Sequence, residues 1–124
     1  CLASLHDVAT LVYDGISKMN GQFHIQLPAD LYAQWQKTVA DVERDNNRKN
    51  EIIASVFTAM SDIRTCPVLI NGHSLAQFYP NPGHRVERSI DYYISDEKQA
   101  QHAAEWMDDH SVSHDDSDSN VTRY

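Results

Sequence analysis

The feature that most constrains the fold is the long stretch between Pro28 and Pro67, which contains no glycine and no proline. Apolar residues recur in it at steps of three, four or seven, which is the spacing of one helix face. Its middle, Glu43–Glu51, consists of polar residues alone. Because no strong helix breaker interrupts the stretch, we predict one helix of roughly 35 residues with a solvated centre over residues 28–65. Two helices broken near Asn46 are the alternative.

A second helical pattern precedes this stretch. Apolar residues at helical spacing predict a helix from Leu5 to Met19, which Asn20-Gly21 would end. The total of 124 residues fits one domain. We therefore divide the chain into an N-terminal helix and connector, residues 1–27, and a main domain, residues 28–124, which together form one structural unit.

The second half of the chain, residues 66–124, has the pattern of a small sheet with helices. Short apolar or β-branched runs predict strands, Gly and Pro clusters predict turns, and a capping serine predicts a further helix. The predicted fold class is α/β (α+β), with N-terminal helices followed by a small mixed sheet flanked by helices. The expected elements are a strand at 68–70, a turn at Asn71-Gly72, a short helix at 73–79, a strand at 89–94, a helix from the N-cap Ser95 to Asp108, a loop at 110–120 and a strand opening at Val121.

The composition of the chain disfavours some classes of binding partner. The net charge of −8 disfavours nonspecific binding to duplex nucleic acid or to an anionic membrane, since both need clustered Lys and Arg. No window is apolar enough to span a membrane, and two distant cysteines suit a reducing cytoplasm. We interpret the His/Asp-rich tract 110–118 as a solvated acidic loop, with a transition-metal site as the alternative. His84 reads as a surface residue.

The segment from Cys66 to Ser95 carries the chemistry. A glycine turn after a strand, at Gly72, allows a phosphate to approach the backbone, and Ser74 adds a hydroxyl at the start of the next helix. A carboxylate on a neighbouring strand, Asp91, would hold Mg²⁺ against the same phosphate. Arg85 and Arg88 would supply positive charge. A plain structural turn and a capping Asp are the alternative.

The run from Val68 to Arg85, followed by Ser89–Ile94, resembles the uncharacterised bacterial nucleotidyltransferase family of the polymerase-beta-like superfamily. Members of that family tend to show an apolar strand ending in Lys-Gly, a short helix ending in Tyr-Pro, an Arg, and then Gly-Asp-Ile-Asp before an apolar strand. The resemblance implies two strand carboxylates that bind Mg²⁺ and a nucleoside triphosphate. A third carboxylate usually comes from a later strand.

The resemblance maps onto particular residues. Gly72 and Ser74 match the phosphate-side turn, Asp91 the second carboxylate and Arg85 the loop arginine. Three positions depart from the pattern: Asn71 stands in place of the lysine, Arg88 in place of the glycine, and Ser89 in place of the first carboxylate. The strand with the third carboxylate is expected beyond Tyr124, so the domain would be C-terminally truncated.

We expect from these residues a degenerate or truncated nucleotidyltransferase-like domain. If active, it would transfer a nucleoside monophosphate from a nucleoside triphosphate to an acceptor hydroxyl. Asp91 would be the catalytic residue and would bind Mg²⁺. Gly72, Ser74, Arg85 and Arg88 would bind the nucleotide. The alternative is a noncatalytic module that binds a protein partner, or a second copy of the chain, through the apolar stripe of the long helix.

Overall fold

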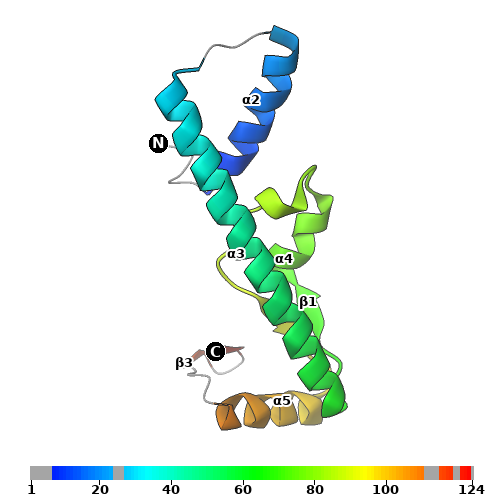
Figure 1. Cartoon of the computed structure of the whole chain (residues 1–124). Coiled ribbons are helices and arrows are strands. Elements are labelled where there is room, and N and C mark those ends of the chain that lie inside the picture. Colours follow the sequence, from blue (N-terminus) through cyan, green and yellow to red (C-terminus); the bar gives the residue numbers. More distant parts are fainter. Residues whose placement is uncertain (1–6, 24–26, 111–114, 119–120, 124) are drawn as a thin grey trace. The chain divides into compact units, whose positions relative to one another are not determined.

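The computed structural model describes residues 7–23, 27–110, 115–118 and 121–123, and most of them are helical (Figure 1). The strands form two separate two-stranded sheets, β1 with β2 and β3 with β4, and the second pair is antiparallel. This arrangement confirms the α+β class. The helices are α2 (Ala9–Phe23), α3 (Ala29–Asp62), α4 (Asn71–Leu75) and α5 (Glu97–Asp109); the 3₁₀ turns are Ala76–Phe78 and Pro82–His84; the strands are β1 (Val68–Ile70), β2 (Asp91–Tyr93), β3 (Asp115–Asp118) and β4 (Val121–Arg123).

Helix α3 is a single helix of 34 residues, as predicted, and the alternative of two broken helices is wrong. Its C-terminal end has two defining hydrogen bonds. The Thr65 N–H donates to the Met60 carbonyl at 2.8 Å, and the Arg64 N–H donates to the Ser61 carbonyl at 3.0 Å. Arg64 has a φ of 58°, so it adopts the left-handed conformation that closes a Schellman motif. Backbone bonding thus ends the helix before Pro67.

Several predicted boundaries differ from those observed. Helix α2 continues through Asn20-Gly21 to Phe23, and its predicted start at Leu5 lies outside the described residues. Helix α4 begins inside the expected turn, at Asn71, and has only five residues. The N-cap of α5 is Asp96, not Ser95, since the Asp96 carboxylate accepts from the Gln99 N–H at 2.9 Å.

Two further differences concern strands. Strand β2 covers only Asp91–Tyr93 of the expected 89–94. Strand β3, at Asp115–Asp118, lies where a loop was predicted, and it pairs with β4, which begins at Val121 as predicted. A polar composition therefore did not prevent pairing with the adjacent strand. Residues 111–114 of the His/Asp-rich tract lie outside the described residues.

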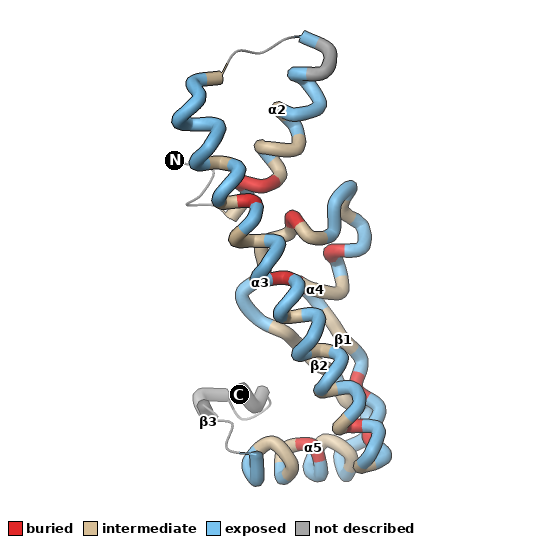
Figure 2. The backbone as a smooth tube through the Cα atoms, viewed as in Figure 1, coloured by how far each residue is buried: buried red, intermediate tan, exposed pale blue. Residues whose placement is uncertain are grey.

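The chain divides into two compact units. The first combines Cys1–Ile52 with Ile70–Asp91, and its buried residues include Ala9, Val39 and Ala76 (Figure 2). The second combines Ile53–Leu69 with Tyr92–Tyr124, and Met60 is its most buried apolar side chain. The division between residues 1–27 and 28–124 stays a prediction. Each unit packs segments that are distant in sequence.

Many large apolar side chains of the described residues are exposed. Phe78 is 76% exposed, and Phe23 is 70% exposed. None of the described helices is both long enough and apolar enough to cross a membrane. The other exposed apolar residues are Val8, Val12, Met19, Leu31, Tyr32, Ile52, Phe57, Val68, Leu75 and Tyr93.

Candidate functional site

Gly72 lies buried at the start of α4, directly against the carboxylate of Glu87. A Cβ added to Gly72 would lie 1.6 Å from Glu87 Oε2 and 2.6 Å from Oε1. Gly72 does not have a positive φ. Glycine therefore permits the close approach of an anionic side chain here, and it adopts no unusual backbone conformation to do so.

Asn71 supplies the unusual conformation of this turn. Its φ is 56°, in the left-handed region where Asn is enriched among residues other than glycine. The Asn71 side-chain amide donates to Asp91 Oδ2 at 3.2 Å. The Ser74 hydroxyl donates to the Asn71 carbonyl at 2.7 Å. The turn therefore brings together two predicted site residues, Ser74 and Asp91, through Asn71.

Arg85 faces the same carboxylate that lies against Gly72. Its Nη2 donates to Glu87 Oε2 at 3.2 Å, and its Nη1 donates to the Tyr79 hydroxyl at 2.8 Å. The Arg85 guanidinium also lies 5.2 Å from the centroid of the Tyr79 ring. Arg85 Nε is buried and has no acceptor among the described residues. Arg85 is thus held in place with one donor still unused.

Lys49 brings a second cation from α3. Its Nζ donates to the Glu87 backbone carbonyl and to Asp45 Oδ2, the latter at 2.6 Å. Only 15% of the Lys49 side chain is exposed. Burial lowers the pKa of His73 below 6.5, and the positive charge of Lys49 lowers it further. His73 is therefore neutral near pH 7, and its Nε2 contacts Asn50 Oδ1 at 2.7 Å.

Arg88 and Ser89 are both exposed. The Arg88 guanidinium pairs with Asp7, at 2.8 and 3.0 Å, while the Arg88 backbone N–H donates to Glu87 Oε1 at 3.1 Å. Only the backbone of Arg88 therefore joins the group around Gly72. The role of its side chain toward a nucleotide stays a prediction.

A metal held by the protein alone does not fit these residues. Asp91 is half-buried and already accepts from Asn71. Nowhere in residues 7–23, 27–110, 115–118 or 121–123 do three His, Cys, Asp or Glu side chains form a metal-binding group. Mg²⁺ commonly takes one or two carboxylates and completes its shell with substrate oxygens and water. A single carboxylate would leave nearly all of that shell to the substrate.

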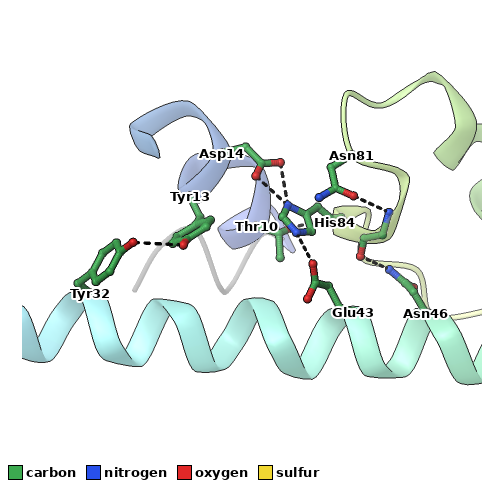
Figure 3. A network of polar contacts seen from close by, with 9 residues as sticks. Thr10, Tyr13, Asp14, Tyr32, Glu43, Asn46, Asn81 and His84 are labelled. Atoms are coloured by element: carbon green, nitrogen blue, oxygen red, sulfur yellow. Dashed lines mark hydrogen bonds and ion pairs between the residues drawn. The ribbon is translucent and has the colours of Figure 1, made fainter. Parts of the chain in front are cut away.

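A second polar cluster surrounds His84, which is only 5% exposed, so its interpretation as a surface residue is wrong (Figure 3). Its Nδ1 lies 2.8 Å from both carboxylate oxygens of Asp14 on α2, and its Nε2 lies 2.9 Å from Glu43 Oε1 on α3. The Thr10 hydroxyl donates to the His84 carbonyl. An imidazole between two carboxylates joins three segments of the first unit.

Asn46 fixes the same turn from the middle of α3. Its side-chain amide donates to the carbonyls of Gly83 and Arg85, at 2.7 and 2.8 Å, and the residue is 4% exposed (Figure 3). The solvated centre predicted for the long helix is therefore wrong at this position. The sequence does carry a signal for these contacts, since Glu43, Asn46 and Asn50 are spaced by three and four residues and so share one helix face.

Sequence reasoning did not single out Lys49 or Glu87. Glu87 follows Arg85 at a spacing of two in a segment without regular structure, so no periodicity marks it. Lys49 lies in the polar stretch of α3, where a charged residue ordinarily faces solvent. The contact between them depends on the packing of the 85–88 segment against α3, which no local pattern encodes.

A protein-family model with the description "Uncharacterised nucleotidyltransferase" matches residues 1–124. Searches of curated proteins and of solved structures give no match.

Proposed function

Because the chain belongs to the uncharacterised nucleotidyltransferase family, we propose that the region around Gly72 and Asp91 binds the triphosphate of a nucleoside triphosphate. One observation carries the proposal: the turn at Gly72 already accommodates an anionic group, the Glu87 carboxylate, against a buried glycine and an arginine. Close backbone approach together with a guanidinium is a common way for proteins to bind phosphate.

Each proposed residue has a role that its position supports. Gly72 and Ser74 lie on the phosphate side, Arg85 supplies positive charge, and Arg88 contributes its backbone N–H, since its guanidinium pairs with Asp7. Asp91 accepts a hydrogen bond from Asn71, which belongs to the same turn. Mg²⁺ carried by the triphosphate would neutralise its charge and contact Asp91. The residues of the chain bind and orient the phosphates.

The proposed reaction is transfer of a nucleoside monophosphate to an acceptor hydroxyl. The hydroxyl oxygen forms a bond to the α-phosphorus, the bond from that phosphorus to the bridging oxygen breaks, pyrophosphate leaves, and the hydroxyl proton passes to solvent or to a base. Catalysis of this kind depends mostly on positioning and charge neutralisation. With Ser89 in place of a first carboxylate, we expect the domain to retain nucleotide binding better than it retains transfer activity.

Calorimetry with ATP, GTP, CTP and UTP, each with and without Mg²⁺, tests this function. We expect at least one nucleotide to bind, and to bind more tightly with Mg²⁺. Ser89→Asp should strengthen the metal-dependent part, since it adds a second carboxylate two residues from Asp91. Ser17→Asp adds the same charge on the exposed face of α2 and should not. The absence of a binding signal with all four nucleotides would contradict the proposal.

A noncatalytic function is favoured by one observation. Along α3, Leu31 and Ile52 are 39% and 44% exposed, so the helix presents apolar surface that no described residue covers fully. Such surface is suited to a protein partner or to a second copy of the chain.

A further inference from the structure

The Glu87 carboxylate lies where the proposed function requires a phosphate group. Its Oε2 accepts from Arg85, and its Oε1 accepts from the Arg88 backbone N–H. Both oxygens also lie within 3 Å of the position that a Cβ on Gly72 would take. A carboxylate and a phosphate oxygen are bound by the same kinds of donors, guanidinium and backbone N–H. The Glu87 carboxylate thus occupies donors that could also bind a phosphate oxygen.

Two cations, Arg85 and Lys49, contact Glu87. Arg85 contacts the carboxylate directly, and its buried Nε has no acceptor among the described residues. Lys49 donates to the Glu87 carbonyl, and its charge acts on the neighbouring His73. The other partner of Lys49, Asp45, is 61% exposed, so water screens this ion pair. Two largely buried cations therefore contact Glu87, Arg85 at its carboxylate and Lys49 at its backbone carbonyl.

We propose that Gly72, Lys49, Arg85 and Glu87 form a polyphosphate site, which Glu87 occupies itself when no ligand is bound. The inference rests on the proposed function and adds two assignments to it. Glu87 competes with the phosphate groups for the donors of Arg85 and of the Arg88 backbone, and it must rotate away before they bind. Lys49, from α3, supplies positive charge to the bound phosphate.

Calorimetry with inorganic tripolyphosphate in the presence of EDTA tests the role of Glu87 without nucleoside or metal. Glu87→Gln keeps the shape of the side chain and removes its charge. We expect it to bind tripolyphosphate on the order of tenfold more tightly than the unsubstituted chain, because one close like charge is lost. Glu97→Gln removes the same charge from the exposed first turn of α5 and should leave the affinity unchanged.

The role of Lys49 is tested in the Glu87→Gln background. Adding Lys49→Gln should weaken tripolyphosphate binding by about tenfold, since a buried cation next to the ligand is removed. Adding Lys37→Gln removes a charge from an exposed position on the same helix and should have little effect. Equal effects of the two lysine substitutions would show that only overall charge matters, which would overturn the assignment of Lys49.

Gly72→Ala provides a further check in the same background. The new Cβ would fill the space beside the backbone, so binding should fall to the level of the unsubstituted chain or below it. Gly15→Ala is the matched control, because nothing lies within 4 Å of a Cβ added there. Circular dichroism of each variant confirms that the fold persists.

The outcomes separate this inference from the proposed function. If Glu87→Gln binds tripolyphosphate no better than the unsubstituted chain, or not at all, the self-occupied site is wrong, whether or not nucleotides bind with Mg²⁺. If Glu87→Gln binds tripolyphosphate more tightly but neither protein binds any nucleotide, the polyphosphate site stands and the nucleotide function is wrong.

Discussion

At the scale of single residues, His84 shows how one buried side chain can hold distant segments together. Burial opposes a charge on its imidazole and by itself lowers the pKa. The hydrogen bonds to Asp14 and Glu43, with their negative charges, outweigh burial and raise the pKa of His84 above 6.5. The imidazolium can donate to both carboxylates at once, whereas the neutral ring can donate to only one.

This arrangement predicts a pH dependence of stability. Since the folded pKa is raised, the stabilisation is complete below about pH 6.5 and is lost as pH rises through the folded pKa. We expect the free energy of unfolding, measured by urea denaturation, to fall as the pH rises from about 6 to about 9.

His84→Gln should lower stability at the acidic end and flatten this dependence. His102→Gln, at an exposed position on α5, should preserve it. An unfolding free energy that is independent of pH in the unsubstituted chain would mean that His84 does not carry the charge.

At the scale of elements, α3 shows what the sequence predicts and what it does not. Its length follows from the absence of Gly and Pro between residues 28 and 67, a local property. Its polar contacts do not follow, because Asn46 is buried and Lys49 is partly buried only once the 81–88 segment packs on them. The site is similar: the sequence indicated Gly72, Ser74, Arg85 and Asp91, but the anion at Gly72 comes from Glu87, through tertiary packing alone.

Asn46→Ala tests this packing. The substitution removes the donor to two carbonyls, those of Gly83 and Arg85, and leaves them without that partner. We expect a loss of about 1–3 kcal/mol in the free energy of unfolding, measured by urea denaturation. Asn47→Ala, next to it on the exposed face, should cost less than about 0.5 kcal/mol. Equal losses for the two variants would contradict the anchoring role of Asn46.

At the scale of the whole molecule, exposed apolar side chains coexist with a net charge of −8. The charge opposes association of identical chains, and the apolar surface favours it. Added salt screens the repulsion and leaves the hydrophobic effect in place. The balance between charge repulsion and the hydrophobic effect decides whether the apolar surface of α3 binds a second copy of the chain.

We therefore predict that the average mass, measured by light scattering, rises with protein concentration, and rises more steeply at high salt. Ile52→Gln, which places a polar side chain on the exposed apolar surface of α3, should reduce the rise. Ala54→Gln, at another exposed position of the same helix, should not. A mass that stays monomeric at every concentration and salt level would rule out self-association and leave a different protein partner.

The left-handed backbone of Asn71 limits which substitutions this turn can accept. At a φ of 56° a side chain with an ordinary Cβ is strained by roughly 1–2 kcal/mol. A lysine at position 71, as in the pattern that this segment resembles, would meet that strain and would also remove the amide that donates to Asp91. We therefore expect Asn71→Lys to lower the stability of this turn as well as to remove its contact with Asp91. Ser89 is exposed and has no positive φ, so Ser89→Asp meets no such backbone constraint.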